Sequence, residues 1–269
     1  MKKMKVMVNG LPGKMATLVA EAISKSKHTL VRKSFTGPDI NDNWCKIGGT
    51  KIQLFRPPER GSANIARGTY VIDFTLPTAA LENVQWYCDR GNPFVMGTTG
   101  VVFQQVHDIV MSSRICAVYA PNMAKQIVAL MAMLEYVSRE YKGVFEEFDL
   151  VVVESHQETK VDFSGTASKI IEYFELMGVV EADIARGKVR DVGMQLGMGV
   201  PREHLAGHGW HRYELVSRDG SMRISLTHDI NGRAPYIQGT MDALHFLQHA
   251  VEQAGMVGQT YSMHDVLRG

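Results

Sequence analysis

Residues 5–16 read KVMVNGLPGKMA, and this stretch indicates the fold class. Lys5–Asn9 is a short apolar run typical of a buried strand, and Lys14–Ser24 places apolar side chains along one helical face. Between them, Gly10 permits a sharp turn, and Gly13 lets a ligand approach the backbone where the helix starts. The G-x-x-G-x-x-A pattern suits the pyrophosphate of a dinucleotide, although a plain strand–turn–helix junction also explains it.

The alternation of strands and helices continues through the first half of the chain. Helices are expected from Pro77 to about Tyr87 and over Val102–Met111. Strands are expected at Thr29–Phe35, Lys51–Phe55, Tyr70–Phe74, Phe94–Met96 and Ile115–Ala120. Repeated β-α units predict a parallel sheet with helices on both faces.

The second half has a different pattern. Asp219-Gly220 is a turn signal between two strand-like segments, Arg212–Ser217 and Met222–Thr227. The hairpin predicts an antiparallel or mixed sheet, and therefore a second domain of α+β type. The other expected elements are a strand at Phe148–Glu154 and helices at Ile127–Tyr141, Ser164–Met177 and Tyr236–Gln253.

The composition excludes several classes of protein. The 269 residues are 45% hydrophobic and 21% charged, which is ordinary for a globular chain and argues against a disordered one. With 29 Lys and Arg against 28 Asp and Glu, the net charge of +1 argues against nucleic acid as the main partner. Three scattered cysteines indicate free thiols in a reducing compartment. Because no apolar stretch suits a signal peptide or a membrane span, we expect a cytoplasmic protein, or a mature form without its targeting segment.

The end of the second expected strand bears on the choice of cofactor. An acidic residue commonly holds the adenosine ribose there, but no Asp or Glu occurs between Glu21 and Asp39. Cations and hydroxyls stand there instead, at Arg32, Lys33, Ser34 and Thr36. They suit a 2′-phosphate, so we hypothesise that NADPH is preferred or at least well used. The alternative is that Arg32 and Lys33 are solvated surface residues.

Two further motifs are candidates for chemistry. Gly97-Thr98-Thr99-Gly100 follows a predicted strand, where a flat ring can lie against the backbone. Residues 154–167 read ESHQETKVDFSGTA and contain two proton carriers, His156 and Lys160. Ser164-Gly165-Thr166 then offers donors for a carboxylate at a helix start, although either hydroxyl alone could be a helix cap.

The string E-S-H-Q-x-x-K-x-D-x-S-G-T-A resembles the signature of dihydrodipicolinate reductases, also described as 4-hydroxy-tetrahydrodipicolinate reductases. Gln157 replaces the second histidine of the common bacterial form, and Phe163 rather than proline precedes Ser164, as in the plant-type branch. Other matching motifs follow in the same order, at residues 8–15, 71–77, 97–100, 120–123, 207–211 and 228–233.

The resemblance implies a step of lysine and diaminopimelate biosynthesis, in which a cyclic dicarboxylate accepts hydride from NADPH and/or NADH. It implies an α/β fold with a Rossmann-type nucleotide-binding domain, residues 1–125 with 238–269. Residues 126–237 would form a smaller α+β domain for substrate binding and tetramerisation, with the active site between the domains. The expected partners are a small dicarboxylate and other copies in a homotetramer, without nucleic acid or membrane. The compartment would be the cytoplasm, or the plastid stroma for a mature plant protein.

Roles for single residues also follow from the resemblance. His156 is implied as proton donor or acceptor, and Lys160 as a proton donor. The implied cofactor residues are Gly10, Leu11, Pro12, Gly13, Lys14 and Met15 at the pyrophosphate, and Gly97, Thr98, Thr99, Ala120, Pro121, Asn122 and Met123 at the nicotinamide. The implied substrate residues are Gln157, Ser164, Gly165, Thr166 and Arg233.

No metal is expected. His204, His208 and His211 have a spacing that would suit one helical face, but Gly207 and Gly209 interrupt any helix there. Two other functions remain open. One is a non-catalytic NAD(P)-binding sensor, and the other is a Rossmann-type dehydrogenase acting on an aldehyde or a sugar. The latter leaves the grouping of His156, Lys160 and residues 164–166 unexplained.

Overall fold

The computed structural model describes residues 2–255 and 257–269. The chain folds into two compact units, residues 1–128 with 235–269 and residues 129–234. The sequence-based boundaries at residues 125 and 238 lie three residues from these limits. Both ends of the chain therefore belong to the first unit, and the second is one continuous segment.

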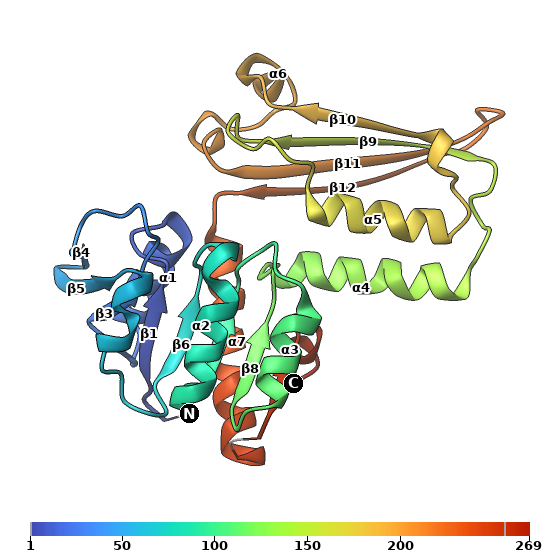
Figure 1. Cartoon of the computed structure of the whole chain (residues 1–269). Coiled ribbons are helices and arrows are strands. Elements are labelled where there is room, and N and C mark those ends of the chain that lie inside the picture. Colours follow the sequence, from blue (N-terminus) through green and yellow to red (C-terminus); the bar gives the residue numbers. More distant parts are fainter. Residues whose placement is uncertain (1, 256) are drawn as a thin grey trace. The chain divides into compact units, whose positions relative to one another are not determined.

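The first unit contains a six-stranded sheet in the order β13-β8-β7-β6-β1-β2. Figure 1 labels β1, β6 and β8 of this sheet. All its neighbouring strands are parallel, which confirms the predicted parallel sheet. The strands are β1 (Lys5–Asn9), β2 (Thr29–Leu30), β6 (Tyr70–Asp73), β7 (Phe94–Met96), β8 (Cys116–Tyr119) and β13 (Gln259–Tyr261).

Helices cover both faces of this sheet because its strands are apolar on both sides. Val6 and Val8 of β1 pack in a core with α1 (Lys14–Lys25) and α7 (Ala234–Ala254). Met7 points to the opposite face, since side chains alternate along a strand. There it joins a second core with α2 (Pro77–Arg90), and α3 (Phe103–Met111) packs beside α2. A last short helix, α8 (Met263–Arg268), follows β13.

The expected strand at Thr29–Phe35 is wrong as a single element. It divides into β2 and β3 (Lys33–Phe35), which belong to different sheets. The N–H of Val31 still donates to Val6 of β1, but the carbonyl of Arg32 already accepts from Gln53. The chain thus passes to a second, three-stranded sheet in the order β3-β5-β4. Its other strands are β4 (Trp44–Ile47), which was not expected, and β5 (Thr50–Phe55), and a 3-10 helix, η1 (Pro57–Ser62), follows.

The second unit is built on a mixed sheet in the order β10-β9-β11-β12, as the hairpin signal predicts. Strands β9 and β10 are parallel, and the other pairs are antiparallel. A core beneath the sheet contains α5 (Gly165–Leu176) and three side chains of α4 (Lys125–Glu140). The strands are β9 (Phe148–His156), β10 (Ile184–Val189), β11 (His208–Ser217) and β12 (Arg223–Asn231), and the short helices are η2 (Glu181–Asp183), α6 (Val192–Gly197) and η3 (Arg202–His204).

Strand β11 begins at His208, four residues before the expected start at Arg212. This added length pairs Gly209 with His156 and His211 with Glu154 on β9. A Cβ atom on Gly209 would lie 3.0 Å from the imidazole of His156, so the absence of a side chain lets the ring lie against β11. The early start of β11 therefore brings several histidines together. Among the described helices, none combines the length and apolar character needed to cross a membrane.

Candidate functional site

Glu154 lies at the centre of a polar cluster in the second unit. Its side chain is fully buried near the end of β9. The backbone N–H of Ser164 donates to Oε2 over 2.7 Å, and the guanidinium of Arg190 donates to Oε1. A buried carboxylate is tolerated only when such partners compensate for its lost hydration. Glu154 thus fixes the start of α5 next to the end of β9.

His156 and His211 lie beside this carboxylate. Nδ1 of His156 is 2.9 Å from the carbonyl oxygen of His208, so the neutral ring carries its proton there. Its Nε2 is 3.3 Å from Nε2 of His211, which must therefore be the donor of that bond. Both Nε2 atoms lie 3.9 Å from Oε2 of Glu154. His211, which sequence reasoning left out of the catalytic set, is thus a direct neighbour of His156.

Burial controls the charge of these rings. It lowers the pKa of His156 to about 4, although the carboxylate of Glu154 acts in the opposite direction. It lowers the pKa of His211 to about 2, helped by the neighbouring His228. His228 stacks on His211 with ring centroids 4.5 Å apart, and burial lowers its pKa to about 4. At neutral pH all three imidazoles are therefore uncharged.

The loop between β9 and α5 carries the remaining predicted residues of the motif. The positive charge of Lys160 lowers the pKa of both His156 and His211, so this ammonium acts on the same cluster. Arg190 donates from Nε to the carbonyl of Lys160, and Gln195 donates to the carbonyl of His156 over 2.8 Å. Gln157 accepts the N–H of Lys160 at its backbone carbonyl, which closes a turn. The loop backbone is thus held on both sides.

The start of α5 offers space for an anion. A Cβ atom on Gly165 would meet no heavy atom within 4 Å, so the first turn is open there. The N–H of Ser164 is bonded to Glu154, and the next amides, those of Gly165 and Thr166, belong to the first turn of α5, where anions bind to helices. Arg233 lies by Gly207, where a Cβ would be 2.7 Å from its Nη1. It therefore contacts the segment that leads into β11.

The predicted cofactor residues lie in the first unit, at the carboxyl ends of neighbouring strands. Gly10 has φ +99°, and a Cβ there would lie 2.4 Å from the carbonyl oxygen of Phe74, so only glycine fits. Helix α1 starts directly after Gly13, which leaves its first amides open toward a phosphate. Residues 97–99 follow β7 and residues 120–123 follow β8, the adjacent strand. Ligands of open α/β sheets bind at this edge.

A buried network that the sequence analysis did not identify connects these strand ends. Asp73, at the end of β6, accepts from the hydroxyl of Tyr87 over 2.5 Å and from Thr98 over 3.2 Å. Asn9, at the end of β1, donates to the same tyrosine oxygen over 2.7 Å. Burial and the charge of Asp73 raise the pKa of Tyr87 well above its usual value, so the phenol remains a donor. The signal in the sequence is that a polar residue ends or follows each of three buried strands.

The four residues expected at a 2′-phosphate do not converge on one point. Ser34 and Thr36 are buried, and their hydroxyls donate to the carbonyls of Phe35 and Leu11. Lys33 donates to the carbonyl of Asn64 over 3.0 Å. Arg32 lines a hollow of about 480 Å³ together with Trp44 and Lys51. A phosphate-binding role therefore remains a prediction chiefly for Arg32.

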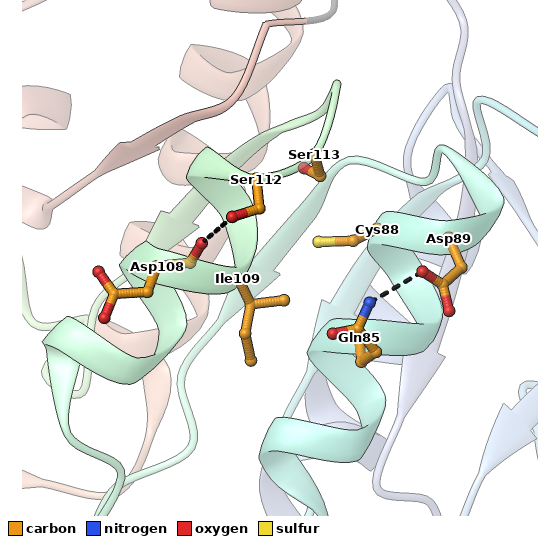
Figure 2. Close-up of a pocket in the computed structure, with 7 residues that line it drawn as sticks. All are labelled: Gln85, Cys88, Asp89, Asp108, Ile109, Ser112 and Ser113. Carbon is orange, nitrogen blue, oxygen red and sulfur yellow. Dashed lines mark hydrogen bonds between the residues drawn. The ribbon is translucent and has the colours of Figure 1, made fainter.

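A further hollow of about 410 Å³ lies between α2 and α3 (Figure 2). Figure 2 shows Cys88 on α2 and Ile109 on α3 pointing into the space between the helices, with Asp89 and Asp108 on the outer sides of α2 and α3. Among the described residues, two carboxylates and no cation line it, so this hollow does not suit an anionic cofactor or a dicarboxylate. Cys88 is a free thiol whose pKa is raised by burial, which makes it a poor nucleophile.

Comparison with known proteins agrees with these features. Residues 4–123 match the family described as dihydrodipicolinate reductase, N-terminus, and residues 127–267 match the corresponding C-terminus. The chain belongs to the dihydrodipicolinate reductase family. The resemblance seen in the sequence motifs is thus confirmed over both units.

Several members of this reductase family can be compared directly. A probable chloroplastic 4-hydroxy-tetrahydrodipicolinate reductase 1 of Oryza sativa subsp. japonica is 40% identical, over 98% of this chain and 78% of its own length. The bacterial enzyme of Ralstonia pickettii (strain 12J) is 28% identical, over 98% and 99%. The higher identity to the plant relative confirms the plant-type branch. The fold matches a dipicolinate-bound dihydrodipicolinate reductase from Paenisporosarcina sp. TG-14 with a TM-score of 0.66 and 16% identity, over 97% and 98% of the two chains.

Proposed function

We propose that this chain reduces 4-hydroxy-tetrahydrodipicolinate to tetrahydrodipicolinate with hydride from NADPH or NADH. The observation that carries the proposal is the grouping of His156, the charge of Lys160 and the open first turn of α5, in a chain of this family. Loss of water from the 4-hydroxy compound gives the conjugated dihydrodipicolinate. One hydride from the cofactor and one proton from the protein then give the product.

The second unit supplies groups for a small dicarboxylate. The first amides of α5 and the ammonium of Lys160 provide donors and positive charge for carboxylates. A related structure described as dipicolinate-bound supports a ligand of this class. We assign substrate contacts to Gly165, Thr166 and Lys160, and supporting contacts to Gln157 and Arg233.

The proton is assigned to His156 together with Lys160. In the free chain, Nδ1 of His156 is bonded to the carbonyl of His208, so Nε2 is the atom that exchanges a proton. The carboxylates of a bound substrate favour the protonated imidazole, because nearby negative charge stabilises it. Lys160 carries a proton already and can neutralise the charge that hydride transfer leaves on the substrate. While His156 is neutral, His211 orients its ring by donating a hydrogen bond to Nε2.

The first unit is assigned to the nucleotide, with its pyrophosphate at Gly10–Met15 and its nicotinamide beside residues 97–99 and 120–123. Hydride passes directly between cofactor and substrate in a reaction of this type. We also propose that NADPH is well used through Arg32, and that the chain forms a homotetramer, which sedimentation velocity would measure. The names of plant relatives described as chloroplastic support a location in the plastid stroma, and the cytoplasm is the alternative.

The test mixes the chain with NADPH and freshly made substrate and follows the loss of nicotinamide absorbance. His156→Ala and Lys160→Ala should each lower kcat by about 10²–10⁴-fold, the range for removal of an acid–base group. NADPH affinity, measured by fluorescence titration, should remain unchanged in both. His249→Ala, an exposed site on α7, serves as the matched control. Near-normal turnover in both variants would remove these residues from the mechanism, and cofactor binding without any turnover would favour a sensor.

A further inference from the structure

Three side-chain atoms of the second unit converge on one point: Oε2 of Glu154, Nε2 of His156 and Nε2 of His211. All lie within 4.8 Å of one another. Within residues 2–255 and 257–269, this is the one group of three or more His, Cys, Asp or Glu side chains that converges in this way. Two imidazoles and one carboxylate form a ligand set that proteins use for zinc.

The distances between the three ligand atoms suit an ion with tetrahedral coordination. Two imidazole nitrogens about 2.0–2.1 Å from zinc lie about 3.4 Å apart at the tetrahedral angle. The two Nε2 atoms here are 3.3 Å apart, so their separation fits two nitrogens bound to one ion. The carboxylate oxygen is 3.9 Å from each nitrogen, so it needs to approach by only about half an ångström.

The surroundings of the three ligands also favour binding. The second nitrogen of His156 donates to the carbonyl of His208 over 2.9 Å, which is the usual support for a metal-bound histidine. Nδ1 of His211 is buried and has no hydrogen-bond partner in the described part of the chain, so it can take the proton that an ion displaces from Nε2. Ser164 and Arg190 orient the carboxylate of Glu154.

The charges nearby select the kind of ion. Arg190 already pairs with Glu154, and Lys160 adds a second positive charge to the cluster. A hard cation such as Mg²⁺ depends on negative charge and oxygen ligands, both of which are scarce here. Zn²⁺ bonds strongly to imidazole nitrogen, which two of the three converging side chains supply.

We propose that Glu154, His156 and His211 bind Zn²⁺ or a similar transition-metal dication, with water in the fourth position. The ion occupies the nitrogen lone pair that exchanges the proton, so it inhibits the reductase. The binding site stands on geometry alone, whereas the inhibition rests on the proposed role of His156.

This site differs from the one that histidine spacing in the sequence suggests. His208 and His211 are three positions apart on β11, so their side chains point to opposite faces of the sheet. Both nitrogens of His208 are engaged, one with the hydroxyl of Ser155 over 2.8 Å and one with the carbonyl of His204 over 3.1 Å. Cross-strand pairing, and not the interval along the chain, therefore selects the three ligands.

The experiment measures zinc binding to the full chain after chelator treatment and dialysis, by calorimetric titration. We expect one Zn²⁺ per chain, no competition from excess Mg²⁺, and a loss of affinity of at least about 10–100-fold in His156→Ala and in His211→Ala. His204→Gln removes a histidine of the rejected spacing, and His245→Gln breaks a second imidazole pair, His28 and His245, 3.1 Å apart in the first unit. Both controls should retain zinc.

The proposed site would be refuted if the chain bound no stoichiometric zinc, or if zinc affinity were lost only in the two control variants. Cobalt provides a test on the unaltered chain, because its visible spectrum separates nitrogen and oxygen ligands from thiolates. Thiolate bands would assign the ion to a cysteine and also overturn the site. In a separate assay, activity should fall in step with zinc occupancy and return on chelation. Binding without inhibition would overturn only the second part of the proposal.

Discussion

Replacing Tyr87 by phenylalanine removes one hydroxyl from the network at the strand ends of the first unit. This hydroxyl is fully buried, donates to Asp73 over 2.5 Å and accepts from Asn9 over 2.7 Å. A hydrogen bond to a charged group contributes about 1.5–3 kcal/mol, and an unpaired buried donor costs about 1–3 kcal/mol. Because Asp73 keeps other donors, we expect Tyr87→Phe to destabilise the first unit by about 2–4 kcal/mol.

Urea unfolding measures this effect in a Trp210→Phe background, where Trp44 and Trp86 report on the first unit. Tyr261→Phe, at a half-buried tyrosine on β13 of the first unit, is the matched control and should change the unfolding free energy by less than about 0.5 kcal/mol. NADPH affinity should also fall, because the network orders the turns after β1, β6 and β7. A stability equal to that of the control would refute the reasoning.

Other perturbations test separate parts of the molecule. Glu154→Gln leaves the half-buried guanidinium of Arg190 without its carboxylate, and we expect it to destabilise the second unit by about 3–5 kcal/mol. Trp210 fluorescence during urea unfolding measures this change, and a loss of less than about 1 kcal/mol would contradict the buried pairing. Burial lowers the pKa of His28 and of His245, so each binds fewer protons folded than unfolded. The stability that this pair contributes is fully present above pH 6.5 and is lost as the pH falls. The Tm of the first unit should therefore decrease as the pH is lowered from 6.5, and the decrease should be less steep in His245→Gln. Arg32→Ala should raise the KM for NADPH and leave the KM for NADH unchanged; equal effects on both would assign Arg32 to the surface.

The parallel sheet was predictable because its signal is local. Val6 to Val8 form an apolar run, Gly10 follows at once, and a helical pattern begins within a few residues. The division of Thr29–Phe35 was not predictable, because nothing between Val31 and Arg32 marks a break. What separates β2 from β3 is pairing with Gln53 on a distant strand, and such pairing leaves no local trace.

The candidate site shows the same limit. His156, Lys160 and the start of α5 lie within one short motif, so sequence reasoning could group them. His211 lies 55 positions from His156 along the chain and reaches it only through the register of β9 and β11. Glu154 was visible in the motif, but its importance depends on partners that the fold supplies.

The division of the chain has a consequence for its synthesis on the ribosome. The second unit is complete once residue 234 has emerged, whereas the first unit still lacks α7 and β13 at that point. Until then β8 has no neighbour on one edge, and the face that α7 covers with Leu244 and Leu247 is exposed. The nascent first half thus presents an unpaired strand and an apolar surface while the later unit can already fold. We therefore expect chains stalled or cut before residue 259 to aggregate through the first unit.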